Sequence, residues 1–151
     1  MTGLITYAFR HLTQVLNMTV DDDDALFDAA AQVRLNAYCP FSHFSVGAAL
    51  LDDAGNLQLG CNVENSAYPE GTCAEANAIG AMIASGATRI RRIAIVGGHD
   101  EVEFCTPCGG CRQKIAEFSD ENTRILLMDE QGDVTEYSVA DLLPKSFRLE
   151  Q

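Results

Sequence analysis

Two short cysteine-containing segments hold the residue types best suited to metal chemistry in this chain of 151 residues. One reads Cys-Ala-Glu from Cys73 to Glu75, and the other reads Pro-Cys-Gly-Gly-Cys and ends at Cys111. Catalytic zinc sites use three protein ligands and leave a fourth position for water. The segments therefore predict an open zinc site with Cys73, Cys108 and Cys111 as ligands and Glu75 as a base beside the water.

The spacing of the cysteines agrees with this interpretation. Cys108 and Cys111 are three residues apart at the start of a predicted helix, so both thiols would point to one side of it. A helix N-terminus lowers the pKa of a thiol and favours the thiolate that zinc requires. Cys73 begins another predicted helix, where the same effect applies. Two helix starts that meet at the edge of a sheet would bring the three sulfurs together.

Two alternatives stay open from the residues alone. Thr72 and Glu75 have the spacing of a capping box, in which Glu75 would only stabilise the start of its helix. A structural zinc module would instead close the site with a fourth protein ligand, for which Cys105, His99 and His43 are the candidates. Neither histidine lies at a His-x-x-x-His spacing, but Cys105 is only three residues before Cys108, so a closed site of four cysteines stays open. The Glu two residues after Cys73 favours the open site.

Composition and charge exclude several classes of function. The formal net charge is −12, which repels phosphate backbones and disfavours a polynucleotide or tRNA substrate. A small, uncharged substrate fits better. No apolar run approaches the ~20 residues of a membrane span, and the N-terminus lacks the pattern of a secretory signal. We therefore expect a cytoplasmic protein with reduced thiols, in which Cys39, Cys61 and Cys105 are small buried side chains.

The elements that position these residues alternate between helix and strand patterns. An acidic run at residues 21–24 suits the start of the first helix, and Thr106 is a candidate N-cap with Pro107 in the first turn. The order of the elements predicts one sheet covered by helices, an α/β layered domain. Helices are expected over residues 23–37, 72–85 and 107–118, strands over 44–51, 57–63, 92–97, 124–128 and 134–137, and a short terminal piece from 141.

The N-terminal segment is the least informative part of the chain. Residues 1–17 have loosely amphipathic spacing, and Met18 is a hypothetical alternative start. The expected organisation is an N-terminal extension over residues 1–17 and a single zinc domain over residues 18–151.

The two zinc segments together match the pattern of zinc deaminases, a Cys/His-x-Glu element followed by Pro-Cys-x-x-Cys, in which the Glu shuttles protons and is not a ligand. Over residues 37–147 the sequence resembles the cytidine deaminase family, in its small form with three cysteine ligands. The resemblance implies one Zn²⁺ per subunit and an α/β/α sandwich with a mixed five-stranded sheet. The other matching segments are residues 38–44, 46–50, 62–69, 111–113 and 142–147.

The resemblance also implies a nucleoside-binding site. Asn62 and Glu64 would bind the ribose hydroxyls, and a carboxylate facing a diol is a good acceptor of two hydrogen bonds. Phe44 would stack near the pyrimidine or the sugar, and the Ala74 backbone N–H would face the base carbonyl O2. Tyr68 would also contact the substrate. Without the resemblance, Phe44 would be interpreted as ordinary core packing.

The reaction implied is hydrolytic deamination of cytidine or deoxycytidine to uridine or deoxyuridine and ammonia, in pyrimidine salvage. Glu75 would accept a proton from water and return protons to N3 and to the leaving amine. The resemblance further implies a homotetramer in which Phe147 reaches into a neighbouring subunit's pocket. Alone, Phe147 would be interpreted as core packing too.

One position departs from the family pattern. Many three-cysteine members carry an Arg directly after the catalytic Glu, but this chain has Ala76 there. Without that cation the thiolates donate more charge to zinc and make its water less acidic. Arg112 or the amides at the helix starts would have to compensate. Blasticidin-type deaminases also lack the Arg, so a modified cytosine nucleoside is the alternative substrate, although they lack the full run at residues 62–69.

Overall fold

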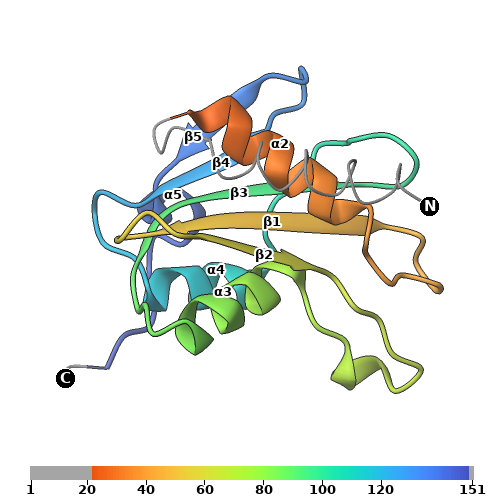
Figure 1. The fold of residues 1–151 in the computed structure, drawn as a ribbon, viewed down its shortest axis with the longest axis horizontal. Coiled ribbons are helices and arrows are strands. Elements are labelled where there is room, and N and C mark those ends of the chain that lie inside the picture. The colour runs from red at the N-terminus through yellow and green to blue at the C-terminus, as the bar shows by residue number, and fades with distance from the viewer. Residues whose placement is uncertain (1–21, 150–151) are drawn as a thin grey trace, which may run out of the picture.

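The computed structural model of the chain describes residues 22–149. The predicted extension over residues 1–17, its amphipathic pattern and the alternative start Met18 lie outside the described residues. The elements are α2 (Asp23–Arg34), β1 (Ser45–Asp52), β2 (Leu57–Cys61), the short 3₁₀ helix η1 (Tyr68–Glu70), α3 (Ala74–Ala84), β3 (Ile90–Gly98), α4 (Gly109–Glu117), β4 (Arg124–Met128), β5 (Val134–Tyr137) and α5 (Val139–Leu142) (Figure 1).

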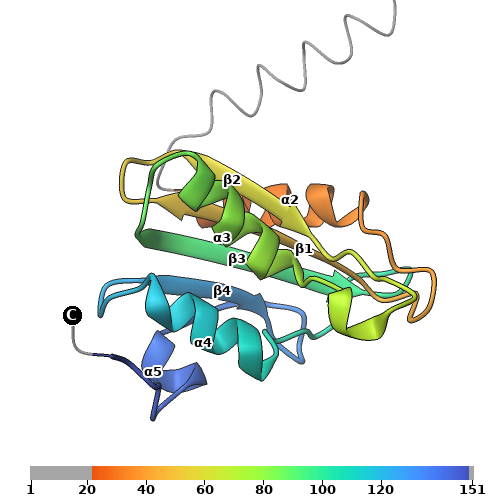
Figure 2. The same cartoon turned by 90° about the horizontal axis from the view of Figure 1, so that it is seen from below.

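The strands form one mixed five-stranded sheet in the order β2-β1-β3-β4-β5. The β3–β4 pair is parallel, and the other three pairs are antiparallel. Helix α2 covers one face of the sheet, and α3 and α4 lie side by side on the other (Figures 1 and 2). This arrangement confirms the predicted α/β/α sandwich. Within the described residues, no helix combines the length and apolar character needed to cross a membrane.

Each face of the sheet has its own apolar core, because successive side chains of a strand point to opposite faces. In β1, Ala48 and Leu50 belong to the core beneath α3 and α4, and Ala49 and Leu51 belong to the core beneath α2. Gly60 in β2 lets α3 approach closely, since a Cβ there would lie 2.3 Å from the carbonyl oxygen of Ala74. The first turn of α3 is therefore held directly against the sheet.

The expected start of α4 was wrong by two residues. The helix is capped by Cys108, and Thr106 and Pro107 lie in the loop before it. The Thr106 hydroxyl is engaged elsewhere, because it accepts a hydrogen bond from Arg112 Nη2 at 3.1 Å. Helix α2 also ends at Arg34, short of the expected residue 37.

The acidic run begins α2 as predicted and also fastens that helix to the sheet. Asp22 is the N-cap, and its Oδ1 accepts hydrogen bonds from the backbone N–H groups of Asp24 and Ala25 at 3.1 and 3.3 Å. Asp23 forms ion pairs with the buried Arg92 of β3 and, at 2.7 Å, with Arg124 of β4. One carboxylate therefore connects the first turn of α2 with two adjacent strands.

We predict that Asp23→Ala lowers the free energy of unfolding by about 1.5–3 kcal/mol, because hydrogen bonds to charged groups are worth that much and both guanidinium groups lose this carboxylate. Urea unfolding of the metal-loaded protein measures the change. Asp24→Ala is the matched control, since it removes the same charge from the same turn at an exposed position. Equal midpoints for the two variants would contradict the importance of the ion pairs.

Candidate metal centre

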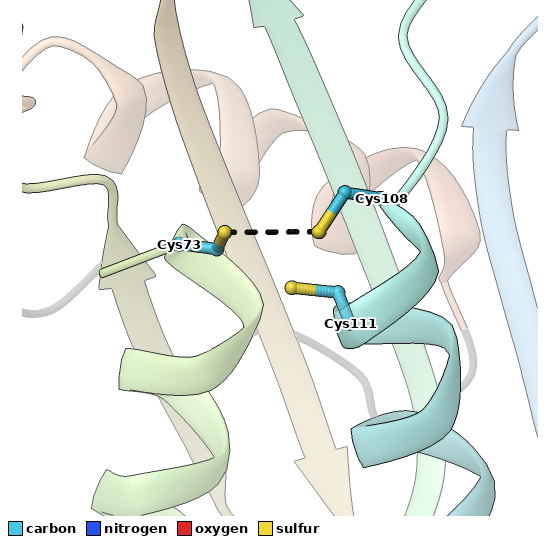
Figure 3. Close-up of side chains that lie close together, drawn as sticks. All are labelled: Cys73, Cys108 and Cys111. Atoms are coloured by element: carbon cyan, nitrogen blue, oxygen red, sulfur yellow. Dashed lines mark hydrogen bonds between the residues drawn. The ribbon is translucent and has the colours of Figure 1, made fainter. Parts of the chain in front are cut away.

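The three predicted ligands come together at the starts of α3 and α4. Cys73 caps α3, Cys108 caps α4, and Cys111 lies in the first turn of α4. Their sulfur atoms all lie within 4.8 Å of one another, and the Cys73 and Cys108 sulfurs are 3.9 Å apart (Figure 3). Both helices point their N-termini at the cluster, so the positive ends of two helix dipoles favour negative charge there.

The electrostatics of the cluster fit a bound cation. Burial raises the pKa of Cys111, and the nearby Glu75 carboxylate raises it further. Burial also raises the pKa of Cys73. Partial burial acts in the same direction on Cys108, but hydrogen bonds from the Cys111 backbone and from the two other thiols bring its pKa below the ordinary value. Three thiolates beside a carboxylate need a compensating charge, and soft thiolate ligands select Zn²⁺ among the common divalent cations.

Glu75 faces this cluster from inside the protein. Its side chain is buried, and its Oε2 accepts a hydrogen bond from the Cys111 thiol at 3.3 Å. The capping-box alternative is wrong, because the N-cap of α3 is Cys73 and no side chain caps that helix start. Thr72 Oγ1 instead accepts a hydrogen bond from Asn77 Nδ2 at 3.0 Å. A carboxylate buried against metal ligands is suited to proton transfer with a ligand beside the metal.

The candidate fourth ligand Cys105 lies outside the cluster. Its sulfur packs on β3, where a Cβ added to Gly97 would lie 2.5 Å from it. Burial, with smaller contributions from Glu75 and Glu103, raises the pKa of Cys105 to about 11, so this thiol is neutral at physiological pH. His99, another candidate, is bound to Glu103 at 2.9 Å. The metal-binding group found among residues 22–149 contains the three predicted cysteines alone.

A cavity of about 360 Å³ opens beside the cluster, which is the size of a small-molecule site. Cys73, Cys108 and Glu75 are among the residues that line it. The structure brings five of the six predicted substrate-binding residues to the same cavity: Phe44, Asn62, Glu64, Tyr68 and Ala74. The sequence pattern had not indicated the other lining residues, which include Val46, Val63 and Thr106.

Glu64 and Asn62 have different roles in building the cavity wall. Glu64 Oε2 accepts hydrogen bonds from the backbone N–H groups of Phe41 and Ser42 at 2.8 and 3.2 Å. Hydrogen bonds lower the pKa of Glu64 and keep it ionised. The largest contribution comes from the Ser42 side chain, and the next largest comes from the Phe41 backbone. The Asn62 amide is used by the backbone, since it accepts from Val46 N at 2.8 Å and donates to Phe44 O at 2.9 Å. Asn62 therefore has one N–H and one lone pair available for a ligand.

Two other predicted residues lie away from the cluster. Phe147 follows α5, is 68% exposed and does not line the cavity of its own chain. Arg112 donates hydrogen bonds to Pro107 O at 2.8 Å and Leu142 O at 3.0 Å, as well as to Thr106. Its guanidinium therefore holds the loop before Cys108, and none of its described hydrogen bonds reaches a thiol. The expectation that Arg112 supplies the cation missing at position 76 is not supported.

Comparisons with known proteins agree with this geometry. The profile of a family described as "Cytidine and deoxycytidylate deaminase zinc-binding region" matches residues 20–127, which include both cysteine segments. A cytidine deaminase from Sporosarcina psychrophila is 40% identical over 129 residues, which are 85% of this chain and 93% of that protein. The crystal structure of a cytidine deaminase from Burkholderia pseudomallei aligns with a TM-score of 0.75 and 40% identity, over 83% of this chain and 99% of that one. The structure of a cytidine deaminase from Mycobacterium tuberculosis aligns with a TM-score of 0.72 and 38% identity, over 85% of this chain and 100% of that one.

The purified protein is expected to contain one zinc ion per chain, and Cys108→Ser should lose most of it on dialysis because a ligand thiolate is gone. Elemental analysis by mass spectrometry measures the content. Cys105→Ser is the matched control, since it removes a thiol from the wall of the same cavity. Loss of zinc from the Cys105 variant would contradict the three-cysteine site and favour a closed one.

Proposed function

Because the chain belongs to the cytidine and deoxycytidylate deaminase family, we propose that it hydrolyses cytidine and deoxycytidine to uridine and deoxyuridine with release of ammonia. The observation that carries this proposal is the position of Glu75, which is buried in contact with Cys111 and lines a ligand-sized cavity. A structural zinc module has no use for a carboxylate at that place. The matched relatives are themselves named cytidine deaminases.

The cysteines and Glu75 have different roles in the proposed reaction. Zn²⁺ held by Cys73, Cys108 and Cys111 would supply Lewis-acid activation of the attacking water. Glu75 accepts a proton from the water while the water oxygen adds to C4 of the pyrimidine. Glu75 then delivers that proton to N3. It then carries the second water proton to the leaving amine, so that ammonia departs and C4 becomes a carbonyl carbon. Each proton passes through one carboxyl group that the protein holds in place.

The cavity supplies the groups that hold a nucleoside. Glu64 is an ionised acceptor at the cavity wall and suits a pair of ribose hydroxyls, with the free N–H of Asn62 beside it. The backbone N–H of Ala74 is the first of α3, where no intrahelical acceptor exists, and it suits the O2 carbonyl of the base. Phe44 and Tyr68 provide aromatic surface for the rings.

Glu75→Gln tests the proposed role directly. The substitution keeps the shape of the side chain but removes the proton acceptor, so kcat for cytidine should fall by ~10²–10⁴-fold while the zinc content stays unchanged. The loss of cytidine absorbance follows the rate, and elemental analysis of the same sample follows the metal. Full activity in this variant with zinc retained would refute proton transfer by Glu75.

Ala76 favours a second candidate substrate, because a site without the usual cation occurs in deaminases that act on blasticidin S. Among the described hydrogen bonds, Arg112 does not replace that cation. Assays of cytidine, deoxycytidine and blasticidin S under the same conditions separate the candidates. The run at residues 62–69, which places Asn62, Glu64 and Tyr68 at the cavity, favours the unmodified nucleosides.

The same proposal includes a homotetramer in the cytoplasm, with a role in pyrimidine salvage. The six cysteines form no disulfide in the structure, and free thiols are consistent with that compartment. Phe147 would enter the cavity of a neighbouring subunit. The residue is 68% exposed, whereas its backbone is held by two hydrogen bonds: Gln113 Nε2 donates to Phe147 O at 2.7 Å, and Phe147 N donates to Gln113 Oε1 at 3.2 Å. An exposed aromatic ring on a fixed backbone is suited to a contact with another subunit.

Mixing of subunits tests the contribution of Phe147 in trans. Phe147→Ala and Glu75→Gln should each be impaired alone, but mixed subunits pair an intact Glu75 with a neighbour's intact Phe147. After co-refolding, the cytidine deaminase activity should exceed the average of the two separate preparations. An activity equal to that average, in samples shown to contain mixed oligomers by native mass spectrometry, would contradict the contribution in trans.

A further inference from the structure

Phe44 lines the cavity and also packs against two residues, Gly97 and His99, to which the proposed chemistry gives no role. One side of the ring faces Gly97 of β3, where an added Cβ would lie 2.9 Å from Phe44 Cε1. A second contact is the imidazole of His99, whose ring is edge-to-face with Phe44 at a centroid distance of 5.1 Å and an angle of 87°. The aromatic wall of the cavity is therefore packed from behind by a histidine that does not itself line the cavity.

His99 is held at both its ring and its backbone. Glu103 Oε1 lies 2.9 Å from His99 Nδ1 and accepts a hydrogen bond of the same length from the His99 backbone N–H. The carboxylate therefore selects the tautomer with the proton on Nδ1 and fixes the plane of the ring. A solvent-exposed imidazole with no such partner would sample several rotamers.

Arg34 connects the backbone beside Phe44 with the backbone of His99. Its guanidinium is buried in the structure, donates to His99 O at 2.6 Å and to Glu101 O at 3.0 Å, and also donates to Ser45 O at 3.2 Å. Ser45 directly follows Phe44 in the chain. The same cation thus connects the backbone next to Phe44 to the backbone of His99.

We propose that His99 is a positioning residue for Phe44, which it holds in the orientation that packs against the bound nucleoside. The proposal rests on the proposed role of Phe44 in substrate binding. Packing of this kind is similar for the substrate, the product and the transition state, and such uniform binding changes KM and leaves kcat unaltered. His99 therefore affects how tightly the cavity binds a nucleoside and leaves the proton transfers at Glu75 unaffected.

The first test compares His99→Ala with Asp100→Ala, which removes an exposed side chain from the next position. With the zinc-loaded protein, His99→Ala should raise the KM for cytidine and the Kd for the product uridine about three- to tenfold, the worth of an aromatic pair, and change kcat less than about twofold. Asp100→Ala should match the wild type in all three values. An unchanged uridine Kd in the His99 variant would overturn the proposal. If kcat and the zinc content both fell in the His99 variant, the proposal would also be overturned. That result would show that His99 supports the fold or the metal site.

The second test is a double-mutant cycle that combines His99→Ala with Phe44→Ala. A general structural role of His99 would give additive effects on the uridine Kd, whereas a role through Phe44 gives non-additive ones. If His99 acts through Phe44, His99→Ala should have no further effect on the uridine Kd once the Phe44 ring is gone. His99→Phe, which keeps an aromatic ring but not the bond to Glu103, should recover part of the lost affinity. Additive effects in the cycle would contradict the proposal.

Failure of the underlying function gives a different result. If Phe44→Ala alone leaves uridine binding unchanged, the proposed role of Phe44 is wrong, and the positioning role falls with it. If Phe44→Ala weakens binding but His99→Ala does not, only the positioning role is wrong.

Discussion

Every part of the site depends on two helix N-termini being held side by side, because their three thiols converge there within 4.8 Å. Helix α3 is held by its approach to Gly60 of β2, and α4 follows from the crossover between the parallel strands β3 and β4. The shared core beneath the two helices includes Ile79 and Met82 of α3 and Ile115 of α4. The predicted metal ligands lie at the N-caps of the two helices and in the first turn of α4, so any tilt of one helix would displace the sulfurs it carries. In this way the apolar core determines the geometry of a polar site.

The cavity wall is stabilised by backbone pairing among its loops. Val63 pairs with Thr72 through two backbone hydrogen bonds of 2.8 and 2.9 Å, and Tyr38 forms a bridge with the same Val63. These bridges join the loop that carries Asn62 and Glu64 to the segment that leads into Cys73. The predicted sugar-binding residues and the first metal ligand therefore lie on one connected framework, which suits a site that must hold a small molecule at a fixed distance from a metal.

The sequence predicted the elements well where local signals agree with the final packing. Strands β4 and β5 have the expected limits, since each is a short apolar or β-branched run bounded by turn residues. The three-cysteine cluster and the place of Glu75 beside it were predicted from residue type and spacing, which are local properties. The N-cap of α4 did not: Thr106 is the better capping residue by type, but its hydroxyl is used by Arg112, and that contact is set by tertiary structure. The hydrogen bonds of the Asn62 amide and the contact of the His99 ring with Phe44 could not be predicted either, because the partners are distant in sequence.

The central claim is that zinc bound to Cys73, Cys108 and Cys111 keeps one coordination position that Glu75 can reach. X-ray absorption spectroscopy at the zinc edge measures the neighbours of the metal directly in the loaded protein. The account predicts three sulfur neighbours and one lighter neighbour, and this ratio should stay the same in Cys105→Ser. A first shell of four sulfurs would contradict the account, because a fourth thiol would then occupy the position at which hydrolysis must occur.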